Sequence, residues 1–231
     1  MIRVDLHTHS CYSMDAWTPP LELVERAVAA GLDRIAITDH GEVEGGLEAH
    51  ARHPEHVIVG EEIHCRCGTH LIGLFLSSRI PNGLDLDETA EHIRAQGGVV
   101  YAPHPYAYAR AAAWHAERAL RVADAVEVFN SRAFLPRWNR RAATAVRQRG
   151  LLGGAGTDTH FPWELGRAYT EMPPFGGASE FVRALTQARP VGLRTGSPLL
   201  HVGSLALERI KGTARRLAGV RGPGRPEEAA A

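Results

Sequence analysis

The segment Ile2-Arg3-Val4-Asp5-Leu6-His7-Thr8-His9 is predicted to be a short apolar strand that runs directly into two histidines. Successive side chains of a strand point to opposite faces, so His7 and His9 lie on the same face and can approach one ion together. Pro19-Pro20 then open an amphipathic helix that ends at Gly31. The chain therefore begins with a strand, a polar strand end and a helix.

The same pattern recurs along most of the chain. Several later strands also run into polar residues, such as Asp39-His40 after the second strand and Pro103-His104 after a later one. One segment, 70–76, instead starts on a histidine and is expected to lie beside 57–59. Apolar periodicity and caps predict strands at 2–6, 34–38, 57–59, 70–76, 99–102, 125–129 and 151–156, and helices at 21–30, 86–96, 138–149, 178–188 and 205–217.

Strands that alternate with helices predict an α/β architecture with a largely parallel sheet, either a barrel or an open doubly wound sheet. The polar residues favour the barrel. They follow at least five strands, and a (β/α) barrel gathers its catalytic groups at the carboxyl ends of its strands, whereas an open sheet concentrates its site at one switch point. We therefore expect a barrel.

Composition agrees with an enzyme-sized globular fold. The 231 residues are 44% hydrophobic and 23% charged, and their formal net charge of zero gives no global attraction to nucleic acid or an anionic membrane. The three cysteines form no disulfide framework, which favours a reducing cytoplasm. Neither a signal peptide nor a membrane span is expected, because no apolar run is long enough.

Residues that could bind metal are unusually many, since thirteen histidines occur in the chain and several stand in short motifs. The candidates combine imidazole nitrogen with carboxylate oxygen, a set that suits Zn, Mn or Fe. The alternative is a set of hydrogen-bonded polar groups without metal, for which burial would be costly. The candidate ligands are His7, His9, Asp15, His40, Glu62, His70, His104, Asp158 and His160.

Nine candidates exceed the needs of one tetrahedral ion, so two or three ions with bridging carboxylates are expected. Adjacent cations can stabilise both the attacking and the leaving oxygen of a polyanionic group, which indicates hydrolysis. A water acidified between the ions would attack phosphorus as a metal-bridging hydroxide, and no protein nucleophile is needed. The candidates for proton transfer or water orientation are Asp39, His40 and Asp158.

Six motifs together resemble the PHP (polymerase and histidinol phosphatase) family, over residues 1 to about 195. They are Asp5-Leu6-His7-Thr8-His9-Ser10 with Asp15, Thr38-Asp39-His40, Gly60-Glu61-Glu62-Ile63, His70-Leu71-Ile72-Gly73-Leu74, Pro103-His104-Pro105 and Gly156-Thr157-Asp158-Thr159-His160. The resemblance implies a distorted seven-stranded, TIM-like (β/α) barrel with a trinuclear metal centre that hydrolyses phosphate esters. Glu61 is equally acidic, but the spacing of the family's Gly-x-Glu motif selects Glu62 as the bridging ligand.

The resemblance also distributes the ligands among three ions. It implies a first ion near His7, His9, Glu62 and Asp158, a second near Glu62, His70 and His104, and a third near Asp15, His40 and His160. Gly166 to Thr170 resemble the C-terminal segment of stand-alone PHP phosphoesterases. Arginine suits bidentate phosphate contacts, so the candidates for substrate binding are Arg167, Arg132 and the neighbouring Asn130, with surface salt bridges as the alternative for each arginine.

The expected activity is hydrolysis of phosphate monoesters, either small phosphorylated metabolites or nucleotides. The alternatives are a histidinol-phosphate phosphatase, a 5′-3′ exonuclease on short oligonucleotides and a non-catalytic regulatory PHP module. A single barrel domain is expected over 1–219, with the PHP-associated segment from about 150. The tail 220–231 is expected to be disordered, because it is rich in Gly, Pro and Ala and lacks apolar periodicity.

Overall fold

A computed structural model of the chain describes residues 1–107 and 110–217, so the tail expected at 220–231 lies outside the described residues. The strands are β1 (Ile2–Thr8), β2 (Arg34–Ile37), β3 (Val57–His64), β4 (His70–Leu74), β5 (Val99–Ala102), β6 (Ala125–Asn130), β7 (Leu152–Gly156), β8 (Tyr169–Met172) and β9 (Arg189–Val191). The helices are α1 (Pro20–Ala29), α2 (Glu44–His50), α3 (Leu86–Ala95), α4 (Arg110–Val122), α5 (Pro136–Arg149), α6 (Ala178–Leu185) and α7 (Leu199–Leu217), with a short 3-10 turn at Pro162–Glu164.

The sheet curls into a barrel, as the sequence predicted. Its strand order is β7-β6-β5-β4-β3-β2-β1-β8-β9, so β1 and β7 are not hydrogen-bonded neighbours in the sheet. The segment that follows β7 nevertheless returns to the end of β1, where the Asp158 amide donates to the His7 carbonyl at 2.8 Å and the His9 amide donates to the Thr159 carbonyl at 2.9 Å. These bonds close the barrel at the end where the histidines lie.

One strand distorts the barrel. β4 runs antiparallel to both β3 and β5, whereas β1, β2 and β3 are mutually parallel, as are β5, β6 and β7. The register pairs His64 with His70 across a tight β3–β4 turn, in which Gly68 takes a φ of 81°. Reversal explains why β4 starts on a histidine. The start of β4 lies beside the carboxyl ends of the parallel strands.

The opposite end of the barrel is closed by apolar side chains. Phe181 of α6 and Phe175 before it pack with residues at the starts of β5 and β6, such as Val99 and Ala125. Phe75, which follows the reversed β4, joins them, with its ring centroid 5.3 Å from that of Phe181. This apolar core fills the end of the barrel opposite the histidines, so the polar residues gather at the carboxyl ends of the strands.

The helices α2 and α4 were not predicted, and the short strands β8 and β9 were also missed. α2 contains Gly45 and Gly46, which have low helix propensity. A Cβ on Gly46 would come within 3.2 Å of Val59, so the glycine lets α2 pack closely on β3. Tertiary packing therefore overrides the local preference.

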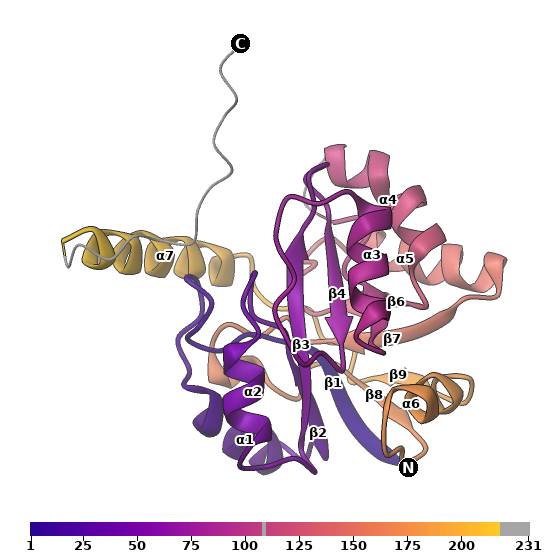
Figure 1. The fold of residues 1–231 in the computed structure, drawn as a ribbon, viewed down its shortest axis with the longest axis horizontal. Coiled ribbons are helices and arrows are strands. Elements are labelled where there is room, and N and C mark those ends of the chain that lie inside the picture. The colour runs from indigo at the N-terminus through magenta and orange to yellow at the C-terminus, as the bar shows by residue number, and fades with distance from the viewer. Residues whose placement is uncertain (108–109, 218–231) are drawn as a thin grey trace.

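Helix α7 stands apart from the helices that surround the sheet, and Figure 1 shows it in yellow beside the loops at the end of β1. Only one face of it is packed, since Ser204 and Leu207 are buried while Val202 and Ile210 are exposed. No helix in the described part of the chain is both long and apolar enough to cross a membrane.

Candidate metal centre

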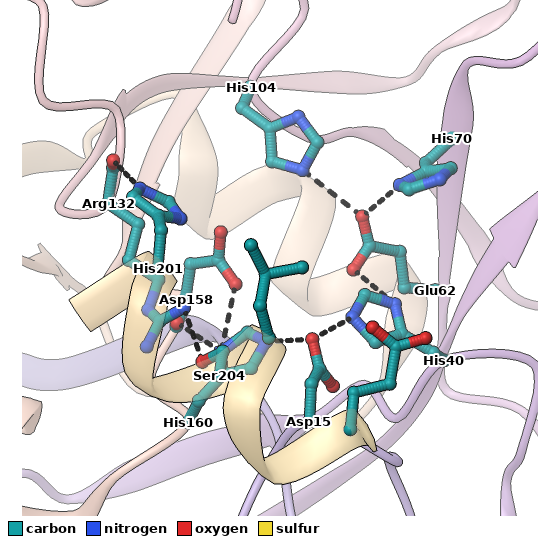
Figure 2. A pocket seen from close by; sticks show the side chains of 12 residues that line it. Asp15, His40, Glu62, His70, His104, Arg132, Asp158, His160, His201 and Ser204 are labelled. Atoms are coloured by element: carbon teal, nitrogen blue, oxygen red, sulfur yellow. Dashed lines mark hydrogen bonds and ion pairs between the residues drawn. The ribbon is translucent and has the colours of Figure 1, made fainter. Parts of the chain in front are cut away.

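The polar end of the barrel holds a cavity of about 250 Å³ (Figure 2). Side chains from many strand ends meet there, together with side chains from α7. The residues that line the cavity are Asp15, His40, Glu62, His70, His104, Arg132, Asp158, His160, His201, Ser204, Leu205 and Glu208. His7 and His9 lie fully buried beneath it. The structure thus brings all nine candidate ligands to one end of the barrel.

Four ligand atoms converge at the bottom of the site. His7 Nε2 lies 3.1 Å from His9 Nε2 and 3.1 Å from Glu62 Oε2. Asp158 Oδ1 lies 3.6 Å from the first nitrogen and 3.2 Å from the second, and His9 Nε2 lies 3.4 Å from Glu62 Oε2. Ligands of a tetrahedral ion with bonds near 2.0–2.1 Å are separated by about 3.3 Å. Each carboxylate oxygen, of Glu62 or of Asp158, therefore has the spacing to the two histidine nitrogens that ligands of one divalent ion would show.

Glu62 connects this group to a second one through its other oxygen. Oε1 lies 2.7 Å from His70 Nδ1 and 3.1 Å from His104 Nε2. The neighbouring Glu61 points to the opposite face of β3, where its Oε2 accepts a hydrogen bond from the Ile80 amide at 2.8 Å. Glu62, not Glu61, is thus the carboxylate that faces the histidines.

A third group surrounds Asp15, which lies in the loop after β1. Its Oδ2 lies 2.9 Å from His160 Nε2 and 3.5 Å from His40 Nε2. His40 also reaches Glu62, because its Nδ1 lies 3.2 Å from Oε2. Nitrogens of His9, His40 and His160 gather within 4.8 Å of one another as well. The three groups therefore lie in contact with one another through His9, His40 and Glu62, as expected of a compact multinuclear site.

The electrostatics of the cluster also suit a cation. Burial, together with the nearby His40 and His160, lowers the pKa of His9 to about 3, which leaves the imidazole neutral. Burial raises the pKa of Glu62, but the surrounding histidines, His70 first, outweigh it and hold that pKa well below its usual range. Burial lowers the pKa of His7 and of His40, but the carboxylates beside them outweigh it and hold both pKa values well above the usual range. A metal ion bound here would therefore displace protons from these imidazoles, because only the neutral ring nitrogen binds metal.

Backbone strain marks two of the candidate ligands. Asp158 has a φ of 56° and His104 a φ of 26°, values that residues other than glycine rarely adopt. Such strain persists only where the surroundings impose it, and it is frequent at functional sites. The chain thus holds both side chains in place against a local conformational cost.

A layer of buried groups orients the ligands from below. Glu127 of β6 places Oε1 3.2 Å from His7 Nδ1, and its Oε2 accepts from the His104 amide at 2.8 Å. Asp5 accepts from the Thr157 amide at 2.9 Å and from the His7 amide at 3.2 Å. Metal-binding histidines usually bond such partners through their second nitrogen. Glu127 was not among the predicted residues, although a glutamate inside an apolar strand was the available signal.

Asp39 lies outside the cavity and serves the loop after β1. Its two oxygens accept from the Ser10 amide at 2.7 Å, the Ser10 hydroxyl at 2.6 Å and the Ser13 hydroxyl at 2.7 Å. The Ser13 hydroxyl in turn lies 3.3 Å from His9 Nδ1. Asp39 therefore reaches His9 through Ser13, and its role in proton transfer stays a prediction.

The three predicted substrate-binding residues divide into three cases. Arg132 lines the cavity, and its guanidinium is buried between the Glu164 carboxylate and the Ser204 hydroxyl. Asn130 is fully buried, and its amide nitrogen donates to Glu127 at 2.9 Å and to Asp158 at 3.2 Å, which leaves no donor for a substrate. Arg167 does not line the cavity. Of the three, only Arg132 lines the cavity, and substrate binding by Asn130 and Arg167 stays a prediction.

Glu164 and the lining residues of α7 were missed by sequence reasoning. Glu164 accepts from the amides of His160 and Phe161, both at 3.0 Å, as well as from Arg132. It lies in the short 3-10 turn Pro162–Glu164, for which no helix or strand was predicted. No motif pointed to α7, because its contributions depend on how the helix lies across the barrel.

Comparisons with known proteins agree with this geometry. Residues 5–106 match the PHP domain family and residues 136–190 match the PHP-associated family. Uncharacterized protein MJ0417 of Methanocaldococcus jannaschii is 33% identical over 177 residues, which cover 74% of this chain and 70% of that protein. Uncharacterized protein MJ1587 of the same organism is 38% identical over 118 residues, or 46% of this chain and 68% of that protein.

Solved structures share the fold at low identity. A two-domain protein from Bacteroides vulgatus, containing a predicted PHP-like metal-dependent phosphoesterase, has a TM-score of 0.66 at 17% identity, over 89% of this chain and 69% of that one. The lesion-specific endonuclease PfuEndoQ from Pyrococcus furiosus has a TM-score of 0.61 at 15% identity, over 98% and 73%. The two segments that match the family models, 5–106 and 136–190, together contain every candidate ligand. The chain therefore belongs to the PHP superfamily.

Proposed function

We propose that this chain is a metal-dependent phosphoesterase that hydrolyses phosphate monoesters of small molecules or nucleotides in the cytoplasm. The observation that carries the proposal is that carboxylate oxygens of Glu62 and Asp158 each lie 3.1–3.6 Å from the paired Nε2 atoms of His7 and His9. Membership of the PHP superfamily supports it. The sequence analysis also predicted an enzyme that hydrolyses phosphate esters, in agreement with the ligand geometry and with the family.

A centre of two or three divalent ions, Zn, Mn or Fe, is the cofactor we propose. Such ions, when bound, lower the pKa of a coordinated water toward neutrality and offset the negative charge of a phosphate. The two oxygens of Glu62 face different histidine groups, which supports a bridging role. The third group, at Asp15, supports a third ion.

The residues of the chain divide the remaining work. Arg132 lies at the cavity with donors beyond those given to Glu164 and Ser204, so it can bind a phosphate oxygen. Asn130 and Glu127 hold Asp158 and His7 in position. Asp158 and His40, which both face the cavity, are the proposed groups for orienting water and accepting its proton.

The test combines metal analysis with phosphate release. The purified protein is assayed for Zn, Mn and Fe and then offered a panel of monoesters, nucleotides and histidinol phosphate. A His7→Ala variant should lose metal and activity together, while His92→Ala, a change on the outer helix α3, should keep both. Metal binding without hydrolysis of any ester would instead support the regulatory-module alternative, and absence of bound metal would refute the proposed centre.

Nucleic acid is the second candidate substrate. DNA polymerase III PolC-type of Oceanobacillus iheyensis is 47% identical over 64 residues, but these are 26% of this chain and only 4% of that protein. The endonuclease with a similar fold points the same way. A 5′-phosphorylated oligonucleotide therefore belongs in the panel.

A further inference from the structure

Helix α7 lies beyond both matched segments, 5–106 and 136–190, yet it forms one wall of the metal-site cavity. Its residues that line the cavity are His201, Ser204, Leu205 and Glu208. Figure 2 shows Ser204 and His201 on this helix beside Arg132. The barrel alone therefore does not define the space in which a substrate binds.

Two anchors fix α7 in this position. The Ser204 hydroxyl, which is buried, accepts from Arg132 Nη1 at 3.0 Å. The second anchor is Lys211, about two turns further along α7. Its Nζ donates to the carbonyls of Cys11 and Ser13 at 3.0 Å each, and also to that of Ala16. Lys211 is the sole lysine of the chain. An ammonium group has three donors and no fixed plane, so it suits carbonyls that approach from different directions.

Leu205 and Glu208 lie between the anchors and face the cavity, three residues apart on one side of the helix. Leu205 is 57% exposed, and Glu208 is also exposed, with no hydrogen-bond or ion-pair partner among the described residues. The cavity, at about 250 Å³, is smaller than the roughly 300–1,000 Å³ of common ligand pockets. An apolar contact and a negative charge thus face a space for a small molecule.

We infer that Leu205 and Glu208 determine specificity, given the proposed phosphoesterase function. They select a small phosphate monoester whose alcohol part offers carbon to Leu205 and carries no second anionic group near Glu208. A carboxylate or second phosphate there would meet the Glu208 charge at short range, where like charges repel. A neutral or cationic alcohol part meets no such penalty.

Three monoesters that differ in the charge of the alcohol part provide the test: O-phosphoethanolamine, glycerol 3-phosphate and 3-phosphoglycerate. In Glu208→Gln, kcat/KM for the anionic 3-phosphoglycerate should rise about fivefold or more, mainly through KM. The value for glycerol 3-phosphate should stay within about twofold. Glu180→Gln, which removes an exposed carboxylate on α6, is the matched control and should change none of the three.

Binding gives a second readout that does not depend on turnover. Calorimetry with the non-hydrolysable 2-aminoethylphosphonate and 3-phosphonopropionate should show that Glu208→Gln tightens only the second. In the turnover assay, Leu205→Ala should lower kcat/KM for butyl phosphate relative to that for glycerol 3-phosphate by several fold, with metal content unchanged. Equal effects on all ligands, or a wild-type preference for an oligonucleotide over every monoester, would overturn the inference. A wild type that hydrolyses no ester would instead refute the proposed function.

Discussion

Arg132 and Glu164 form a buried ion pair in which two guanidinium nitrogens lie 3.0 and 3.1 Å from the two carboxylate oxygens. The side chains are 3% and 1% exposed, so neither charge is compensated by water. The pair joins the end of β6 to the segment that carries His160. It therefore links a proposed phosphate-binding group to a proposed metal ligand.

Removal of one partner should be costly. Glu164→Gln leaves the Arg132 charge buried without its counter-charge, and we expect a loss of about 3–5 kcal/mol in the free energy of unfolding. Urea denaturation measures it. The exposed pair of Glu180 with Arg183 is the comparison, and Glu180→Gln should cost no more than about 1 kcal/mol. Similar losses in both variants would contradict the role given to burial.

Glu127→Gln should weaken metal binding while the barrel stays folded. The amide can still accept from His7, but its NH₂ group then faces the Asn130 amide and the His104 backbone N–H, which are both donors. Changes in such orienting groups typically lower metal affinity about 10–100-fold. Competition with a chromogenic chelator measures the affinity, and Glu22→Gln on the outer helix α1 is the control. Unchanged affinity would show that Glu127 has no orienting role.

Glu61 should make stability depend on pH. Burial raises the pKa of its carboxyl from 4.5 to about 7, and Oε1 has no hydrogen-bond partner among the described residues. The folded chain thus holds the proton more tightly than the unfolded chain, and this part of the stability is lost as pH rises from about 4.5 through 7. Glu61→Gln stays neutral. Its free energy of unfolding relative to wild type should therefore be higher at pH 8 than at pH 5, and a difference independent of pH would contradict the assignment.

The cysteines should differ in reactivity. Cys65 is fully buried, and burial raises the pKa of its thiol to about 11, whereas Cys67 is partly exposed two residues later. Thiolate is the reactive form, so an aromatic disulfide reagent at pH 8 should label Cys67 in the native protein and reach Cys65 only after unfolding. Rapid labelling of Cys65 in the native state would show that the β3–β4 turn is open.

Local patterns predicted much of the fold. The strands that run into histidines, such as β1 and β5, appear where the apolar runs predicted them, because buried strands and their polar ends leave a clear signal. α2 left none, since Gly45 and Gly46 oppose a helix and only packing on β3 accounts for it. β8 is four residues long and is defined by its pairing with β1.

The candidate site shows the same division. His7 and His9 could be proposed together because a two-residue spacing on a strand fixes their common face. Asn130 and Arg167 could not be judged, since their roles depend on neighbours that are distant in the chain. Glu208 could not have been proposed from the sequence, because no motif indicates that α7 lies beside the strand ends.

The reversed strand β4 limits how the chain can change in length. His70 faces Glu62 because the turn at residues 65–69 pairs His64 with His70 and Glu62 with Ile72. Strand side chains alternate between faces, so one inserted or deleted residue that shifted this register would turn His70 away from the cavity and a neighbour toward it. Changes by two residues would preserve the facing. The turn length thus controls both facing and reach, because an odd shift turns His70 away and an even shift moves it about 7 Å along the strand from Glu62.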